Sequence, residues 1–154
     1  MKQNNPFLFL DSFDFIVGPI VSLRILSKVP QKGKELPFYW YSIVEAATGK
    51  TIGKISLKVG DGLQAYWGGN VGYEVDEPHR GHRYAYEAAK LLFPLARRHG
   101  MESLFISCED DNAASARTIE LLGGVLLEKG VPPKDYYAYS EGIGLQRVYR
   151  IPVM

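Results

Sequence analysis

The segment from Tyr73 to Leu92, YEVDEPHRGHRYAYEAAKLL, constrains the fold more than any other part of the chain. It starts with the pattern of a strand, passes through Pro78, and continues with apolar residues at three- and four-residue intervals from Tyr84 to Leu95. That spacing is typical of an amphipathic helix. The segment therefore predicts a strand whose carboxyl end leads through a short turn into a helix.

The predicted helix runs from about Arg80 to His99, and Gly100 is a suitable residue to end it. Pro94 lies inside this span, where a proline removes a helical hydrogen bond. We therefore expect Pro94 to kink the helix or to loosen its last turn.

The start of this helix has the composition of an anion-binding turn. The first N–H groups of a helix have no partner within it, and the helix dipole places positive charge there. Gly81 lets a ligand approach the backbone, while Arg80, His82 and Arg83 surround it with positive charge. The turn therefore predicts a cradle for a phosphate or pyrophosphate, and a solvated basic turn without a ligand is the alternative.

The rest of the chain alternates strands and helices with no linker, which predicts a single domain over residues 1–154. A hairpin turn is expected around residues 48–50, loops at 31–37 and 61–69, and a second helix within 111–124. The strands are predicted at 19–29, 38–46, 51–59, 70–75, 103–108, 125–131 and 144–153. This order indicates an α/β fold with a mixed sheet and two helical crossovers.

Two motifs in this order resemble the GNAT superfamily, the acetyl-CoA-dependent N-acetyltransferases. The first is RGHRYA at Arg80–Ala85, after a strand, and the second is Asn112 with Ser115 in the next helix, closed by LLGG. The resemblance covers roughly residues 20–131. It implies a GNAT-like, mostly antiparallel central sheet with a splayed strand pair and flanking helices, and transfer of an acetyl group from acetyl-CoA to a primary amine.

The resemblance also implies which residues bind the cofactor. Backbone groups near the end of the first motif's strand would hold the pantetheine arm, helix-start amides of residues 81–85 the pyrophosphate, and the second motif the thiol end. The expected set is Val75, Arg80, Gly81, His82, Arg83, Tyr84, Ala85, Asn112 and Ser115. Asn112 could instead serve only to cap its helix.

The catalytic roles follow less directly from the resemblance. Glu74 is the carboxylate nearest to the strand end and is the candidate general base, although strand alternation points it away from the side of Val75. Cys108 and the tyrosines are candidate proton donors to the leaving thiolate. The alternatives are that Glu74 is a surface strand residue and that Cys108 is a small core residue.

Three positions depart from the family pattern. Arg83 stands where the family has its second glycine, Ile119 where many members carry a tyrosine acid, and Gly124 where a phenylalanine is usual. The connection 27–37 is also too short for the helices that many members place there, so the acceptor side is expected to be open or closed by another subunit. A non-catalytic CoA-binding module and an interaction domain are therefore the alternative functions.

Composition excludes several other classes. The net charge of +1 argues against a dedicated nucleic-acid binder, and no apolar run is long enough for a membrane span. Cys108 is the one cysteine, and the three histidines, with His79 and His99 expected at the surface, have no spacing typical of a metal site. We expect a cytoplasmic protein that can form a homodimer. Its acceptor is expected to be a small-molecule or peptide amine.

Overall fold

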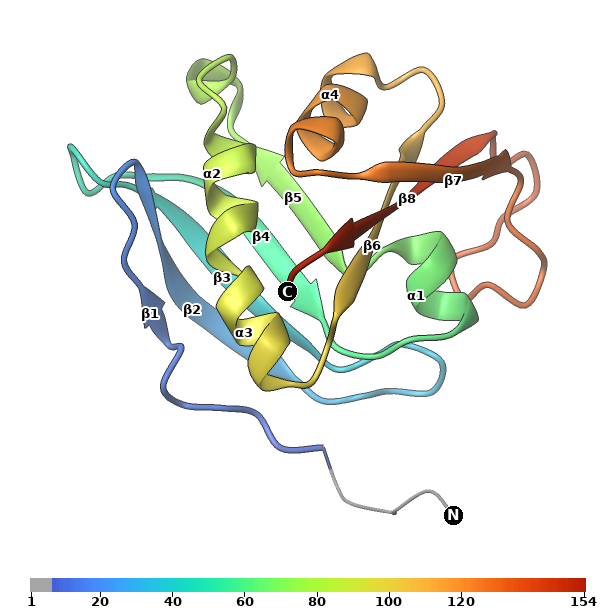
Figure 1. Cartoon of the computed structure of the whole chain (residues 1–154), viewed down its shortest axis with the longest axis horizontal. Helices are drawn as coiled ribbons and strands as arrows, with labels where there is room; N and C mark the ends of the chain where they lie inside the picture. The colour runs from blue at the N-terminus through green and yellow to red at the C-terminus, as the bar shows by residue number, and fades with distance from the viewer. Residues whose placement is uncertain (1–6) are drawn as a thin grey trace.

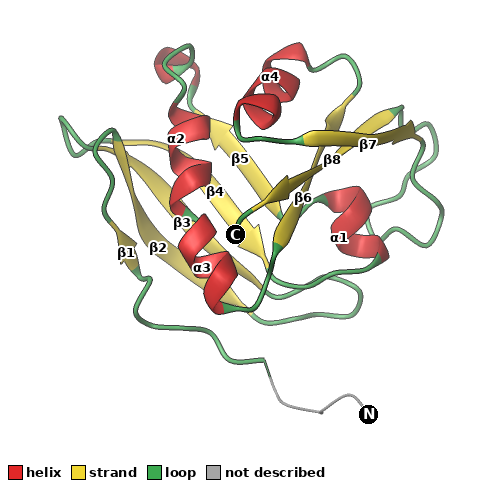
Figure 2. Ribbon diagram, viewed as in Figure 1, coloured by secondary structure: helices red, strands yellow, loops and turns green. Residues whose placement is uncertain are grey.

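The computed structural model describes residues 7–154, which form two antiparallel sheets and four α-helices (Figures 1 and 2). The first sheet has the order β1-β2-β3-β4-β5 and the second the order β6-β8-β7. The strands of the two sheets are β1 (Phe15–Ile16), β2 (Val21–Val29), β3 (Phe38–Glu45), β4 (Thr51–Lys58), β5 (Val71–Val75), β6 (Ser103–Glu109), β7 (Val125–Gly130) and β8 (Gln146–Pro152). The helices are α1 (Leu63–Gly68), α2 (Tyr84–Leu91), α3 (Phe93–Arg98) and α4 (Ala113–Leu121), and a 3-10 turn η1 spans Glu77–His79.

The first sheet has one covered and one open face because its strands alternate. On β3, Tyr39, Tyr41 and Ile43 are fully buried, and they lie on the face that α2 and α3 cover (Figure 1). Burial of such apolar side chains is the main favourable contribution to folding. On the opposite face, Trp40 and Lys54 are exposed. Residues 30–37, which join β2 to β3, contain only an isolated bridge and no helix.

The expected fold class is therefore confirmed: the chain is mixed α/β, mostly antiparallel, with a splayed strand pair. Figure 1 shows β5 beginning beside β6 near the middle of the molecule and the two strands diverging from there, β5 toward α2 and β6 toward α4. Each of these strands pairs with its own sheet, β5 with β4 and β6 with β8. The predicted single sheet is thus divided at this pair.

Two predicted boundaries were wrong. Residues 61–69, predicted as a loop, contain α1, whose Ala65 is buried and whose Tyr66 ring contacts Phe105 of β6 edge-on at 5.3 Å. This helix depends on tertiary packing, because a segment of six residues is too short to be helical alone. The helix predicted from Arg80 begins instead at Tyr84.

Pro94 divides the long helix as expected. Leu92 ends α2 and precedes α3, and Pro94 occupies one of the first positions of α3, where its missing N–H removes no helical bond. Gly100 then ends the helix with a positive φ of 79°.

His99 was predicted at the surface, but it lies half-buried against the N-terminal segment. Its ring stacks on Phe7 at 5.1 Å, and its Nε2 lies 2.7 Å from the Tyr39 hydroxyl. That hydroxyl accepts from the Leu10 N–H at 2.7 Å, and its own proton is available for a bond to Nε2. Burial lowers the pKa of His99 and so favours the neutral imidazole.

Stability is therefore expected to fall as the pH drops below about 6.5, the ordinary pKa of histidine. Because the folded-state pKa of His99 is depressed, the unfolded chain binds its proton first, and the folded state loses stability as pH falls through the folded pKa. Urea unfolding at several pH values between about 5 and 7.5 tests this. His99→Gln should flatten the slope; an unchanged slope would contradict the assignment.

Two features are absent from the described residues, a membrane-spanning helix and a metal-binding cluster. None of the helices in residues 7–154 is both long and apolar enough to cross a membrane. Over the same residues, no three or more His, Cys, Asp or Glu side chains are grouped so that they could hold a metal ion.

Candidate active site

Asn70 joins the two sheets where β5 and β6 are closest. The residue is 1% exposed, and its N–H donates to the Phe105 carbonyl at 2.6 Å while its Oδ1 accepts from the Phe105 N–H at 2.8 Å. Its Nδ2 donates to the carbonyls of Lys58 and Gly60, both at 3.0 Å. The strands therefore meet at a fixed point and diverge from it.

The edge of β5 beside this gap presents backbone groups to it. The Asp76 N–H donates to the Ile52 carbonyl at 2.8 Å, so residue 76 points toward β4. Adjacent residues in a strand direct their N–H and C=O groups to opposite sides, so those of Val75 point away from β4. The Val75 carbonyl accepts from Arg80 Nε at 2.8 Å, which fixes the following turn against the strand end.

The turn after η1 depends on two residues with positive φ. Gly81 has φ 90°, and no atom lies within 4 Å of the position that a Cβ would occupy there. The space above its backbone is therefore open to a ligand. Arg83 has φ 61° and ψ 26°, the left-handed conformation, and is the one non-glycine residue with positive φ in the described part of the chain.

The open helix start lies directly after this turn. Arg83 is the N-cap of α2 and makes no side-chain capping bond. The first intrahelical bond runs from the Glu87 N–H to the Arg83 carbonyl at 3.0 Å, so the amides of Tyr84, Ala85 and Tyr86 precede the helical ladder. The amides predicted at the helix start were those of residues 81–85. Because α2 begins at Tyr84, the amides that are free at its start are those of residues 84–86. Exposed His82 and Arg83 add their side chains to this turn.

The Tyr84 side chain has a structural role, and its ring centre lies 5.4 Å from that of His82 in the turn. Its hydroxyl donates to Glu45 Oε2 at 2.6 Å, which ties α2 to the β3–β4 hairpin. This bond, with burial and the charge of Glu45, raises the pKa of Tyr84. Tyr84 can therefore offer a ligand its backbone N–H alone.

Arg83→Gly is expected to stabilise the protein by roughly 0.5–1 kcal/mol. A left-handed conformation costs an L-residue about 1–2 kcal/mol, and the added flexibility of glycine in the unfolded chain removes part of that gain. Arg83→Ala keeps the backbone strain and is the control for loss of the guanidinium. Urea unfolding of both variants checks this: equal stabilities would mean that the backbone at residue 83 is not strained.

The start of α4 contacts β5 through Ser115. Asn112 is its N-cap, with Oδ1 accepting from the Ser115 N–H at 3.1 Å, so the expected cap is confirmed. The Ser115 hydroxyl lies 2.7 Å from the hydroxyl of Tyr73, which reaches across from β5. The Tyr73–Ser115 contact therefore joins β5 to the start of α4.

Cys108 and Tyr73 form a pair of protonated groups at this contact. Cys108 is 7% exposed at the end of β6. Burial raises the pKa of the Cys108 thiol and of the Tyr73 phenol, and the hydrogen bond of each with Ser115 offsets only part of this rise. Both groups therefore hold their protons at neutral pH, as a proton donor must.

Glu74 lies on the other face of the sheet. It is exposed and lines a cavity of about 420 Å³ together with Trp40, Lys54 and Ser56. The side chains of Tyr73 and Glu74, which are neighbours on β5, thus lie on opposite faces of the sheet, as strand alternation requires.

Sequence reasoning did not name Asn70 and did not single out Tyr73 among the candidate tyrosines, although these two residues shape the site most. A buried asparagine at a strand start was the one local signal for Asn70, and Tyr73 had none because its partner Ser115 is 42 residues away. Ile119, at the position of the missing tyrosine, is fully buried in the core. The Tyr73 hydroxyl, from β5, instead contacts Ser115, four residues before Ile119 on α4.

Comparisons with known proteins give the site its context. The sequence profile of the acetyltransferase (GNAT) domain matches residues 22–125. A protein from Vibrio cholerae, provisionally described as a ribosomal-protein-serine acetyltransferase, has a similar structure with a TM-score of 0.64 and 14% identity, over 90% of this chain and 97% of that one. No curated protein is significantly similar in sequence.

Two further structures share the fold over a smaller part of their length. A GNAT-family acetyltransferase from Bacillus anthracis has a TM-score of 0.59 and 16% identity, over 74% of this chain and 66% of that one. The ribosomal L7/L12 alpha-N-protein acetyltransferase, solved with coenzyme A, has a TM-score of 0.58 and 20% identity, over 75% and 62%. At these identities the likeness shows the fold alone.

Proposed function

Because the chain belongs to the GNAT family and is an acetyl-CoA-dependent acetyltransferase, we propose that it transfers the acetyl group directly to a primary amine. One observation carries the proposal: an uncapped helix start with open space above Gly81 lies across a splayed strand pair from Tyr73, Cys108 and Ser115. Such a site offers an anion cradle at one end and proton donors at the other.

The residues of the turn fit the pyrophosphate of acetyl-CoA. The amides of residues 84–86 and the side chains of Arg80, His82 and Arg83 would hold its charge, while the outward-facing N–H of Val75 would bind the pantetheine arm. Bound acetyl-CoA supplies an activated acetyl thioester. The Val75 N–H would also donate to the thioester carbonyl oxygen as it gains negative charge.

The chain's titratable groups would handle two protons. The amine nitrogen bonds to the acetyl carbon as the carbon–sulfur bond breaks, and the amine proton passes to Glu74 or to a water that Glu74 holds. The leaving thiolate takes a proton from Tyr73 or Cys108, which hold theirs at neutral pH. Ser115 positions the Tyr73 hydroxyl through their 2.7 Å hydrogen bond.

Tyr73→Phe is expected to lower kcat by roughly tenfold, because solvent and Cys108 can still protonate the thiolate. The variant keeps the packing of the ring and should leave KM for acetyl-CoA within about twofold. Ser115→Ala is the matched control, since it removes the partner of the hydroxyl and not the hydroxyl itself. An unchanged kcat in Tyr73→Phe would exclude Tyr73 as the acid.

The function is tested first by ligand binding and then by turnover. A ligand at a hundredfold its Kd adds about 2.7 kcal/mol, which should raise Tm by roughly 5–10 °C with acetyl-CoA or CoA and not with NAD. Release of CoA with a panel of primary amines, and mass spectra of the products, then establish transfer. Absence of binding to acetyl-CoA would refute the proposal.

A non-catalytic CoA-binding module is the second candidate. It is favoured by Arg83 at the glycine position and by Ile119 in place of a tyrosine. Binding of CoA without turnover of any amine would select it. A cytoplasmic location, a homodimer and a single domain over 1–154 remain predictions from the sequence.

A further inference from the structure

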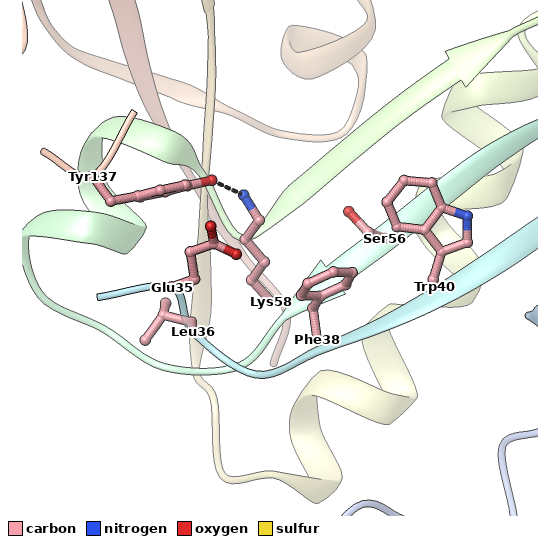
Figure 3. A pocket seen from close by; sticks show the side chains of 7 residues that line it. All are labelled: Glu35, Leu36, Phe38, Trp40, Ser56, Lys58 and Tyr137. Carbon is pink, nitrogen blue, oxygen red and sulfur yellow. Dashed lines mark hydrogen bonds between the residues drawn. The ribbon is translucent and has the colours of Figure 1, made fainter. Parts of the chain in front are cut away.

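Two adjoining cavities lie on the open face of the first sheet, opposite α2 and α3. The near cavity, of about 420 Å³, is lined by Trp40, Lys54, Ser56, Gly72 and Glu74, close to the splayed pair. The far cavity, of about 230 Å³, is lined by Leu36, Phe38, Trp40, Ser56, Lys58 and Tyr137 (Figure 3). Trp40 and Ser56 line both, so the two cavities adjoin along these residues, and together they are called the groove.

The groove follows the register of three strands. Lys54 of β4 is directly opposite Glu74 of β5, and in the next row Trp40, Ser56 and Gly72 lie side by side. Directly opposed side chains have Cβ atoms about 4.5–5.5 Å apart, and successive rows on one face are about 7 Å apart. Gly72 places no side chain between the charged row and the Trp40 ring.

Lys54 and Glu74 are opposed but not joined. Within the described residues neither forms an ion pair, and both are exposed. Lys58, in contrast, is engaged: its Nζ donates to the Tyr137 hydroxyl at 3.0 Å and lies 5.4 Å from the centre of that ring. Figure 3 shows this contact closing the far end of the groove, beside Glu35. The groove thus has one carboxylate and one ammonium group for a ligand at its near end.

From this arrangement we propose that the acceptor is a free α-amino acid with an aromatic or large apolar side chain. Its ammonium group meets Glu74 and its carboxylate meets Lys54, since the two charges of an amino acid are separated by a single carbon and suit a directly opposed pair. Its side chain passes over Gly72 onto Trp40 and toward Phe38. The inference rests on the proposed function, because it names the acceptor of that same site.

The test compares L-phenylalanine with L-phenylalaninamide, which lacks the carboxylate. For each protein the ratio of the two kcat/KM values is taken, and the change in this ratio on mutation cancels the different amine pKa values of the two acceptors. Lys54→Met should lower the acid-to-amide ratio roughly 10- to 100-fold, the worth of a charge-assisted hydrogen bond. Lys50→Met, an exposed lysine in the hairpin turn, should leave the ratio unchanged.

Two further readouts address binding and the side chain. Calorimetry with CoA-saturated protein should give a weaker Kd for phenylalanine in Lys54→Met, with no turnover required. Trp40→Ala should lower kcat/KM for phenylalanine roughly tenfold or more relative to that for alanine.

The possible outcomes distinguish failure of the amino-acid assignment from failure of the proposed function. A Lys54→Met variant that affects acid and amide equally would overturn the amino-acid assignment. Acetylation of amides or peptides without acetylation of amino acids would overturn the inference and leave the proposed function intact. Binding of CoA with no amine acetylated would remove both.

Discussion

Gly81→Glu is expected to weaken acetyl-CoA binding by at least roughly 100-fold, or about 2.7 kcal/mol. A carboxylate about 4 Å from a phosphate charge costs about 4 kcal/mol at an effective dielectric constant of 20. The open space above Gly81 gives the new side chain room in the same region as the ligand. The expected result is loss of the thermal shift with acetyl-CoA and CoA and a matching fall in kcat/KM.

Two controls separate charge and backbone strain from folding. Gly81→Gln has the same shape without the charge, so it should retain at least tenfold more affinity than Gly81→Glu. Gly49→Glu changes a glycine with φ 75° and open surroundings in the hairpin turn, so it suffers similar strain away from the site. If Gly81→Glu bound acetyl-CoA as tightly as the parent protein, the cradle would lie elsewhere.

Asn70→Leu is expected to lower the free energy of unfolding by roughly 4 kcal/mol. It leaves the Phe105 N–H and the carbonyls of Lys58 and Gly60 buried without the partner they have now. An unsatisfied buried group costs about 1–3 kcal/mol, and the three costs overlap because the groups are neighbours. Urea unfolding measures the effect, and m should stay nearly constant if the fold is kept.

Asn112→Ala is the matched control for Asn70→Leu. Asn112 makes one exposed side-chain bond at a helix end, so its loss should cost about 1 kcal/mol. Asn70→Asp keeps the acceptor oxygen but turns an ionised carboxylate toward two carbonyls, so its deficit should grow as the pH rises above about 4. If Asn70→Leu cost no more than Asn112→Ala, Asn70 would not be the fixed point of the splayed strands.

The sequence alone determined the features whose causes are local. Strand alternation, the helical spacing after Tyr84 and the break at Pro94 depend on residues within a few positions of one another, and the structure matches them within a few residues. The Asn112 cap was predictable for the same reason, since it bonds residue 115. The motif RGHRYA indicated the fold class through its order with the second motif. The basic turn around Gly81 also indicated an anion site, although its helix begins four residues later than expected.

Only the tertiary structure decided how the site is assembled. The Asn70 contact with Phe105 joins residues 35 apart, and the Tyr73 contact with Ser115 joins residues 42 apart, so no local pattern encodes either. Helix α1 forms because β6 gives its apolar side chains a surface to pack on, which a six-residue propensity cannot reveal. The placement of Glu74 opposite Lys54 likewise depends on the register of β4 and β5. Local sequence sets which elements form, and long-range packing and pairing decide which side chains meet.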